Sequence, residues 1–253
     1  MSRVVASLVI AALATTSAVS PAEKSSGGHW YGTYRTPEVI VFNTKKFSRE
    51  DVPKDWDDLL DVRWKNKIIL RYPLASGTMR IIFSALIDRE IKRTGDVQGG
   101  FRWLRRLDGN VRSYVADPTQ LYLMLARDEE ALTVWNLPDV QLQVKVHDFP
   151  FGFVIPQSGT PMVVEGIAIV AGAKHPGPAK EFYDYVTSRE SMILAADKFF
   201  RIPVRSDIES SALPDWVGQL DLKPMDVDWR LVMEKEQEWM GYWEEHIKGK
   251  GPP

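Results

Sequence analysis

The chain has 253 residues, of which 44% are hydrophobic and 26% are charged, and its formal net charge is −2. This is the composition of an ordinary globular protein, with enough chain for one large domain or two smaller ones. The near balance of 32 basic and 34 acidic residues provides no overall positive field, so we expect no nucleic-acid partner. The chain contains no cysteine, which excludes disulfides, thiolate zinc sites and a cysteine nucleophile.

The first 22 residues have the features of a secretory signal peptide. Arg3 supplies a positive start, "VVASLVIAALA" (4–14) supplies an apolar run, and small residues precede an expected cleavage after Ala22. The alternative is an internal helix of a truncated domain. The apolar run is too short to span a membrane, and no later segment reaches the necessary length.

Strands and helices are predicted to alternate from residue 38 to about residue 150. This alternation favours an α/β layer with a mostly parallel sheet. The β-branched runs indicate strands and the 3.6-residue periodicities indicate helices. In chain order we expect a loop at 25–37, strands at 38–43 and 67–72, helices at 78–95 and 99–110, a strand at 110–115, a helix at 117–129, strands at 131–135 and 142–149, two further strands within 149–172, helices at 175–190, 191–200 and 228–247, and a frayed tail.

No pattern in the chain indicates catalysis. The four histidines are far apart, and neither a His-Glu-x-x-His pattern, a Gly-x-Ser-x-Gly pattern, a P-loop nor a Gly-x-Gly-x-x-Gly pattern occurs. One cluster of arginines could hold phosphates, but its helical spacing favours a solvated face: Arg102, Arg105, Arg106 and Arg112. We therefore predict no enzymatic activity, no metal site and no cofactor.

The segment "RYPLASGTMRIIF" (71–83) holds the strongest candidate for a binding site. Ser76, Gly77 and Thr78 follow a predicted strand and open a predicted helix, whose first N–H groups lack partners and carry partial positive charge. Together they predict a cradle for an anion, because glycine lets a ligand approach the backbone closely. The alternative is a capping turn without a ligand. We expect Ser76→Pro or Gly77→Val to abolish binding in a protein that still folds.

Two other groups are candidates for the same cleft. Trp135 and Asn136 end the strand "ALTVW", although a tryptophan beside a strand more often belongs to the core. Tyr31, Tyr34 and Arg35 combine aromatic rings with a guanidinium in the loop that enters the sheet. For these three the alternative is a hydrophobic plug.

Several stretches together resemble the extracellular solute-binding proteins of bacterial ABC importers, in the branch that includes iron(III)-binding members. They are "GHWYGTYRTPEVIVFNT", "PKDWDDLLDVRWKNKIIL", "SGT" and "VEGIAIVAGAKHPGPAKEFYDYVTSRE", and the resemblance covers about residues 28–247. It implies the α/β fold of type II periplasmic binding proteins, in which two lobes with central mixed sheets flanked by helices close on a ligand.

The resemblance also implies a function without catalysis. The expected protein is a monomeric periplasmic receptor that delivers a small, anionic or oxygen-rich solute to the membrane permease of an ABC importer. Carried over by residue, Ser76, Gly77 and Thr78 meet the anion, and Trp135 and Asn136 meet the ligand from the same lobe. Iron-binding members have adjacent tyrosines where this chain has "WNLPD", so this position offers no tyrosinate ligand for iron. An iron(III) receptor is therefore the alternative and not the expected function.

The resemblance implies an incomplete first lobe, either because the protein is shortened or because the gene start is misplaced or disrupted. Family members usually carry a long stretch before the "WYG" loop, and here only the predicted leader precedes it. We expect a signal peptide at 1–22, a loop and hinge strand of the first lobe at 23–42, the second lobe at 43–149, and a return to the first lobe with the C-terminal helices at 150–253. A truncated remnant that captures no ligand is a further alternative.

Overall fold

The computed structural model describes residues 27, 29–127 and 131–251. The predicted leader therefore lies outside the described residues. The chain divides into two compact units: unit 1 comprises Met1–Thr36 and Val163–Leu220, and unit 2 comprises Pro37–Met162 and Asp221–Pro253. Each unit thus combines segments that are distant in the sequence.

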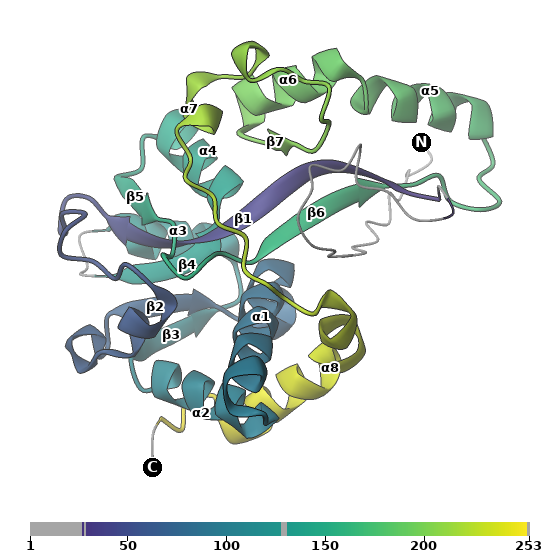
Figure 1. Ribbon diagram of the computed structural model, residues 1–253. Helices are drawn as coiled ribbons and strands as arrows, with labels where there is room; N and C mark the ends of the chain where they lie inside the picture. Colours follow the sequence, from purple (N-terminus) through teal and green to yellow (C-terminus); the bar gives the residue numbers. More distant parts are fainter. Residues whose placement is uncertain (1–26, 28, 128–130, 252–253) are drawn as a thin grey trace. The chain divides into compact units, whose positions relative to one another are not determined.

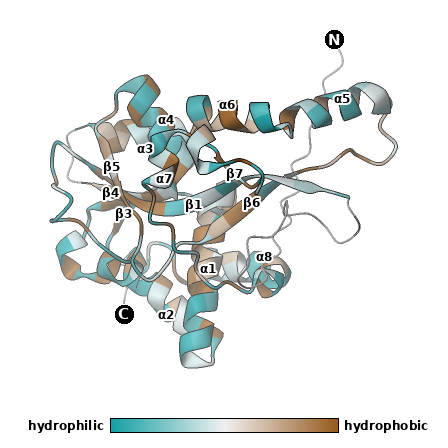
Figure 2. Cartoon of the chain, turned by 45° about the horizontal axis from the view of Figure 1, so that its top comes forward, coloured by the Kyte–Doolittle hydropathy of each residue, from teal (hydrophilic) through white to brown (hydrophobic). Residues whose placement is uncertain are grey.

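Unit 2 is built on a mixed sheet. Its strands follow the order β3-β2-β4-β1-β5, in which β2 runs parallel to β3 and β4, whereas β1 is antiparallel to β4 and β5. Their bounds are Tyr31–Asn43 (β1), Ile68–Arg71 (β2), Val111–Val115 (β3), Leu132–Asn136 (β4) and Phe151–Val154 (β5). The apolar residues of these strands form much of the core, and β4 and β5 lie in a largely brown region of Figure 2.

Helices flank this sheet, and capping side chains explain where most of them begin. The helices of unit 2 are α1 (Gly77–Thr94), α2 (Val97–Asp108), α3 (Pro118–Ala126), α4 (Leu137–His147) and α8 (Trp229–His246), and short 3-10 turns are η1 (Trp56–Leu60), η2 (Val62–Trp64) and η3 (Pro73–Ala75). Asp117 caps α3, with Pro118 in its first turn, as the sequence predicts. Gly95 ends α1 at a φ of 77°, in the left-handed region that glycine adopts without strain.

The last helix completes the core of unit 2. Trp243 of α8 is fully buried, with its ring 5.6 Å from that of Phe83 and 5.1 Å from that of Tyr114. The hydroxyl of Tyr72 donates to the carboxylate of Glu244 at 2.5 Å. Helices α1 and α8 accordingly lie side by side (Figure 1).

The predicted frayed tail is wrong as far as Gly251. The backbone N–H groups of Gly249 and Gly251 donate to the two carboxylate oxygens of Asp108, at 2.9 and 2.8 Å. Asp108 is buried and also accepts a hydrogen bond from the hydroxyl of Tyr114 at 2.8 Å. The two backbone bonds hold the end of the chain against α2, and the third joins α2 to β3.

Unit 1 contains the first half of β1, which pairs with β6 (Met162–Ile167) and β7 (Ile202–Pro203). Its helices are α5 (Pro176–Val186), α6 (Arg189–Phe199) and α7 (Asp215–Gly218), with a 3-10 turn at η4 (Ser210–Ala212). The loop predicted at 25–37 is a strand from Tyr31 onward. The hydroxyls of Thr33 and Thr36 both bond to Glu165 of β6, at 2.9 and 2.6 Å, and fix the strand there.

Two other predictions differ from the structure. Residues 142–147 of the strand predicted at 142–149 form the end of α4, a helix that begins where the side chain of Asn136 caps it. The units also change at Thr36/Pro37, Met162/Val163 and Leu220/Asp221 rather than after residues 42 and 149. Helix α8, expected with the first lobe, belongs to unit 2 because it packs on α1.

Candidate functional site

Three helices of unit 2 begin at one edge of its sheet. Strands β2, β3 and β4 are parallel, so their carboxyl ends share an edge. From these ends the chain enters α1, α3 and α4, which are capped by the side chains of Ser76, Asp117 and Asn136. Partial positive charges at the starts of three helices therefore gather at this edge, where open α/β sheets commonly bind ligands.

The start of α1 offers two unused backbone donors. The Ser76 hydroxyl accepts the Met79 N–H at 3.3 Å, so this buried side chain is a cap, as the alternative interpretation proposes. The backbone N–H groups of Gly77 and Thr78 have no acceptor within the described part of the chain. A Cβ added to Gly77 would meet no atom within 4 Å, so a ligand has room to approach.

The start of α4 lies beside that of α1. Asn136 accepts the backbone N–H of Asp139 at 2.9 Å, and its amide donates to the Thr78 hydroxyl at 3.4 Å and to the Asp139 carboxylate at 2.9 Å. The structure thus brings together Thr78 and Asn136, which are 58 residues apart in the sequence. Asp139 places a carboxylate next to the two helix starts.

Trp135 directly precedes Asn136 in β4 and is buried. It is 4% exposed, and its ring meets that of Tyr122 edge-on at 6.2 Å, so it belongs to the core. Its indole N–H meets no acceptor in good hydrogen-bond geometry among the residues that the structure describes, but it faces the Tyr122 hydroxyl. Burial raises the pKa of the Tyr122 hydroxyl and the nearby Asp139 carboxylate raises it further, whereas the Trp135 indole lowers it. The net shift is upward, so this phenol stays neutral.

Arg71, at the end of β2, is a site residue that the sequence analysis missed. Its guanidinium lies 5.8 Å from the centre of the Trp135 ring. Its Nε donates to the carbonyl of Ala116 and its Nη2 to that of Ala75, each at 3.1 Å. The available signal was an arginine at the carboxyl end of a predicted strand, directly before the Ser-Gly-Thr segment.

The other predicted site residues belong to unit 1. The ring of Tyr31 lies 5.9 Å from that of Tyr183 of α5, at a pocket of about 770 Å³ within unit 1. Tyr34 and Arg35 pair with β7 and do not line this pocket. The pKa of Tyr34 is raised, mainly because the side chain is partly buried. The charge of Arg201 lowers this pKa and the charge of Glu165 raises it. Side chains three apart along a strand point to opposite faces, so Tyr31 and Tyr34 do not form one cluster.

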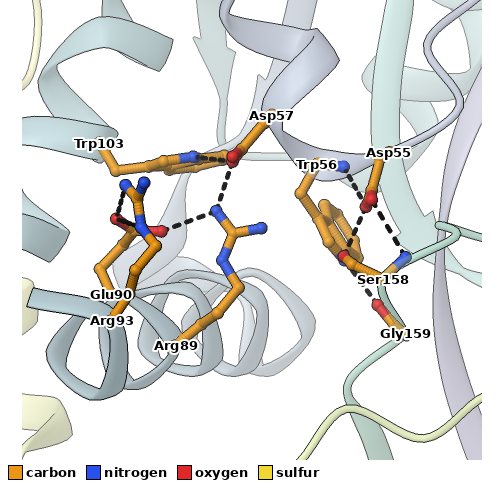
Figure 3. Close-up of polar contacts among 9 residues, drawn as sticks. All are labelled: Asp55, Trp56, Asp57, Arg89, Glu90, Arg93, Trp103, Ser158 and Gly159. Carbon is orange, nitrogen blue, oxygen red and sulfur yellow. Dashed lines mark hydrogen bonds and ion pairs between the residues drawn. The ribbon is translucent and has the colours of Figure 1, made fainter.

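The "DWDDLL" part of the quoted motif is structural (Figure 3). The Trp56 indole donates to the carbonyl of Gly159 at 2.8 Å, which fixes η1 against the segment after β5. Asp57 accepts from the Trp103 indole at 2.7 Å and from Arg89 at 2.5 Å. Burial opposes the ionisation of Asp57, but these hydrogen bonds outweigh it and its pKa is lowered.

Two further types of site are absent from the described residues. Among them, no three His, Cys, Asp or Glu side chains are grouped in a way that could hold a metal ion. None of the helices within the described ranges is long and apolar enough to cross a membrane.

Comparison with known proteins identifies a family for the chain. The sequence model of the bacterial extracellular solute-binding proteins matches residues 9–223. The chain is 25% identical over 229 residues to a "Probable ABC transporter periplasmic-binding protein y4fP" of Sinorhizobium fredii, covering 86% of this chain and 61% of the relative. It is 23% identical over 229 residues to an "Fe(3+)-binding periplasmic protein" of Serratia marcescens, covering 85% and 63%.

Solved structures confirm the predicted fold. The periplasmic binding protein AfuA from Actinobacillus pleuropneumoniae, with exogenous fructose-6-phosphate bound, matches with a TM-score of 0.71 at 24% identity. That match covers 89% of this chain and 70% of AfuA. The chain spans less than two thirds of the length of the two sequence relatives, from Sinorhizobium fredii and Serratia marcescens.

Proposed function

The chain belongs to the bacterial extracellular solute-binding proteins, and from this premise we propose that it is a receptor for a small, anionic or oxygen-rich solute. In this proposal the solute is bound without being chemically changed. The receptor is periplasmic and passes the solute to the membrane permease of an ABC importer.

The convergence of α1 and α4 is the observation that carries this proposal. The hydrogen bond between Thr78 and Asn136 joins the two helix starts, and the N–H groups of Gly77 and Thr78 are available to an acceptor. Backbone N–H groups at a helix start favour oxygen atoms that carry negative charge. A ligand oxygen at this position would accept from both.

The choice of solute rests on this chain's own residues. Similar proteins include one named for Fe(3+) and one solved with fructose-6-phosphate, so the fold accommodates unlike ligands. The end of β4 and the residues that follow it are Asn136, Leu137 and Pro138, with no tyrosine to bind iron. This favours an oxygen-rich or anionic solute over ferric iron. Tyr31, Tyr34 and Arg35 remain proposed solute-binding residues.

A thermal-shift screen of the full chain tests the proposed function. The panel contains inorganic phosphate, citrate, sugar phosphates, neutral sugars and a ferric salt, and each hit is followed by titration calorimetry. We expect at least one oxyanion to raise the melting temperature with one-to-one binding, and mass spectrometry to recover it unchanged. A folded chain that is stabilised by no solute, or one that converts its ligand, would contradict the proposal.

The intact mass of the protein from the periplasmic fraction tests its export. Loss of residues 1–22 is expected if the apolar start is a leader. The family match begins at residue 9, within that segment, so retention of these residues would instead assign them to the binding protein itself.

A further inference from the structure

Arg71 contacts the segments before all three helix starts. Ala75, which accepts from its Nη2, directly precedes the cap of α1, and Ala116, which accepts from its Nε, directly precedes the cap of α3. Trp135, beneath the guanidinium, directly precedes Asn136, the cap of α4. One cation is therefore held where three partial positive charges gather.

No carboxylate within the described residues lies within ion-pair distance of Arg71. The nearby acids serve their own helices: Asp117 accepts the Gln120 N–H at 2.9 Å, and Asp139 accepts from the Asn136 amide. The two carbonyls that Arg71 bonds are neutral, and the guanidinium retains donors on Nη1. The Arg71 guanidinium thus keeps donors that its protein partners do not satisfy, beside the open N–H groups of Gly77 and Thr78.

We propose that Arg71 selects the charge of the solute by binding an oxyanion group, a carboxylate or a phosphoryl group, at this edge of the sheet. The inference rests on the proposed function and narrows its solute to a class. A guanidinium fork matches the paired oxygens of both groups. The Arg71 guanidinium repels a bare ferric ion, and a neutral sugar would leave the charge of the guanidinium without a counter-charge.

The position of Arg71 is fixed before the solute arrives. Its two hydrogen bonds and the Trp135 ring hold the guanidinium, so binding does not have to order a free side chain. A lysine at this position keeps the charge but cannot bond both carbonyls and a solute in the same geometry. Arg71→Lys should therefore bind more weakly than the wild type and more tightly than Arg71→Gln.

Calorimetry on the full-length chain tests the inference with inorganic phosphate and citrate as the two oxyanion probes, and with glucose and a ferric salt as the contrasting ones. The variants are Arg71→Gln and Arg71→Lys. Arg63→Gln is the matched control, because Arg63 also stacks on a tryptophan, 4.9 Å from the Trp64 ring, but its side chain is 56% exposed and pairs with Asp61. The probe that binds, phosphate or citrate, distinguishes a phosphoryl from a carboxylate ligand.

We expect Arg71→Gln to weaken the oxyanion by about 10- to 100-fold, because a hydrogen bond to a charged group is lost, and Arg63→Gln to leave it unchanged. Oxyanion affinity for Arg71→Gln within about twofold of the wild-type value would overturn the inference. So would a wild-type protein that binds glucose and neither oxyanion, although the proposed receptor for an oxygen-rich solute would stand; binding of ferric iron alone would overturn both the inference and the proposed solute class. Binding of none of the probes would overturn both.

The salt dependence of wild-type binding tests the inference independently of the variants' folding. Affinity for the oxyanion should fall as ionic strength rises, because screening weakens attraction between charges. Oxyanion affinity that is unaffected by salt would overturn the role of Arg71 even if Arg71→Gln fails to fold.

Discussion

Replacement of Gly77 by alanine adds one methyl group at the proposed binding site. The added Cβ meets no protein atom within 4 Å, and the backbone φ of Gly77 lies outside the left-handed region. The protein should therefore fold normally. Ser76→Pro, which the sequence also suggested, is unsuitable: Ser76 has a φ of −140° and its N–H donates to Pro73.

Gly77→Ala should change stability and affinity in opposite directions. Alanine restricts the unfolded chain, which should raise the free energy of unfolding by about 0.5 kcal/mol and the melting temperature by about 1–2 °C. The methyl group would occupy open space at the start of α1, where the solute is proposed to approach the N–H groups of Gly77 and Thr78. Losing one hydrogen bond to an anion costs about 1.5–3 kcal/mol, so affinity should fall by about 10- to 100-fold.

Differential scanning fluorimetry and calorimetry with the best oxyanion from the screen measure both effects. Gly177→Ala is the matched control, since Gly177 also lies in the first turn of a helix, α5, and an added Cβ meets nothing within 4 Å there. The control should show normal affinity. If Gly77→Ala is at least as stable as the wild type and binds equally well, the solute does not approach this backbone and the reasoning is refuted.

Three further predictions concern one residue of the site and two structural carboxylates of unit 2. Asn136→Asp should preserve the cap of α4 but weaken oxyanion binding in calorimetry, because it replaces an amide donor by a negative charge. Asp108→Ala should lower the free energy of unfolding by about 2 kcal/mol in urea titration and speed hydrogen exchange at residues 249–251, since Tyr114 and the tail lose their acceptor. Because the pKa of Asp57 is lower in the folded than in the unfolded protein, its ionised carboxylate adds to the free energy of unfolding. This contribution is fully present above the pKa of the unfolded carboxyl, about 3.9, and is lost as the pH falls through the folded pKa. Asp57→Asn should therefore be less stable at pH 7 and lose less stability between about pH 5 and pH 2, measured by thermal melts; an unchanged pH profile would contradict the role of this carboxylate.

The sequence predicted the elements around the candidate site well, because their signals are local. Ser76 and Asp117 mark helix starts through their own side chains, and Gly95 marks an end through its φ. The link between Thr78 and Asn136 was anticipated only as a shared cleft, on the rule that the ends of parallel strands meet at one edge.

What the sequence missed depends on contacts between distant residues. Arg71 gains its position from the carbonyl of Ala116, 45 residues away, which no local pattern reveals. The strand character of residues 31–36 depends on Glu165 of β6, and a loop-like composition concealed it. The alternating pattern at 142–149 predicted a strand wrongly for a local reason. The helix that Asn136 caps extends through most of this segment.

The packing of α8 also determines when unit 2 can fold during synthesis. Glu244 meets Tyr72 across 172 positions, and Asp228 meets Asp88 across 140, so these contacts form only when the end of the chain has emerged. Until then Phe83 and Tyr114 lack Trp243 as a neighbour and their apolar surface stays open. A nascent chain with such late, long-range contacts folds slowly and benefits from a chaperone. In the proposed exported receptor, the same delay would keep the chain unfolded enough for translocation until α8 packs on the core.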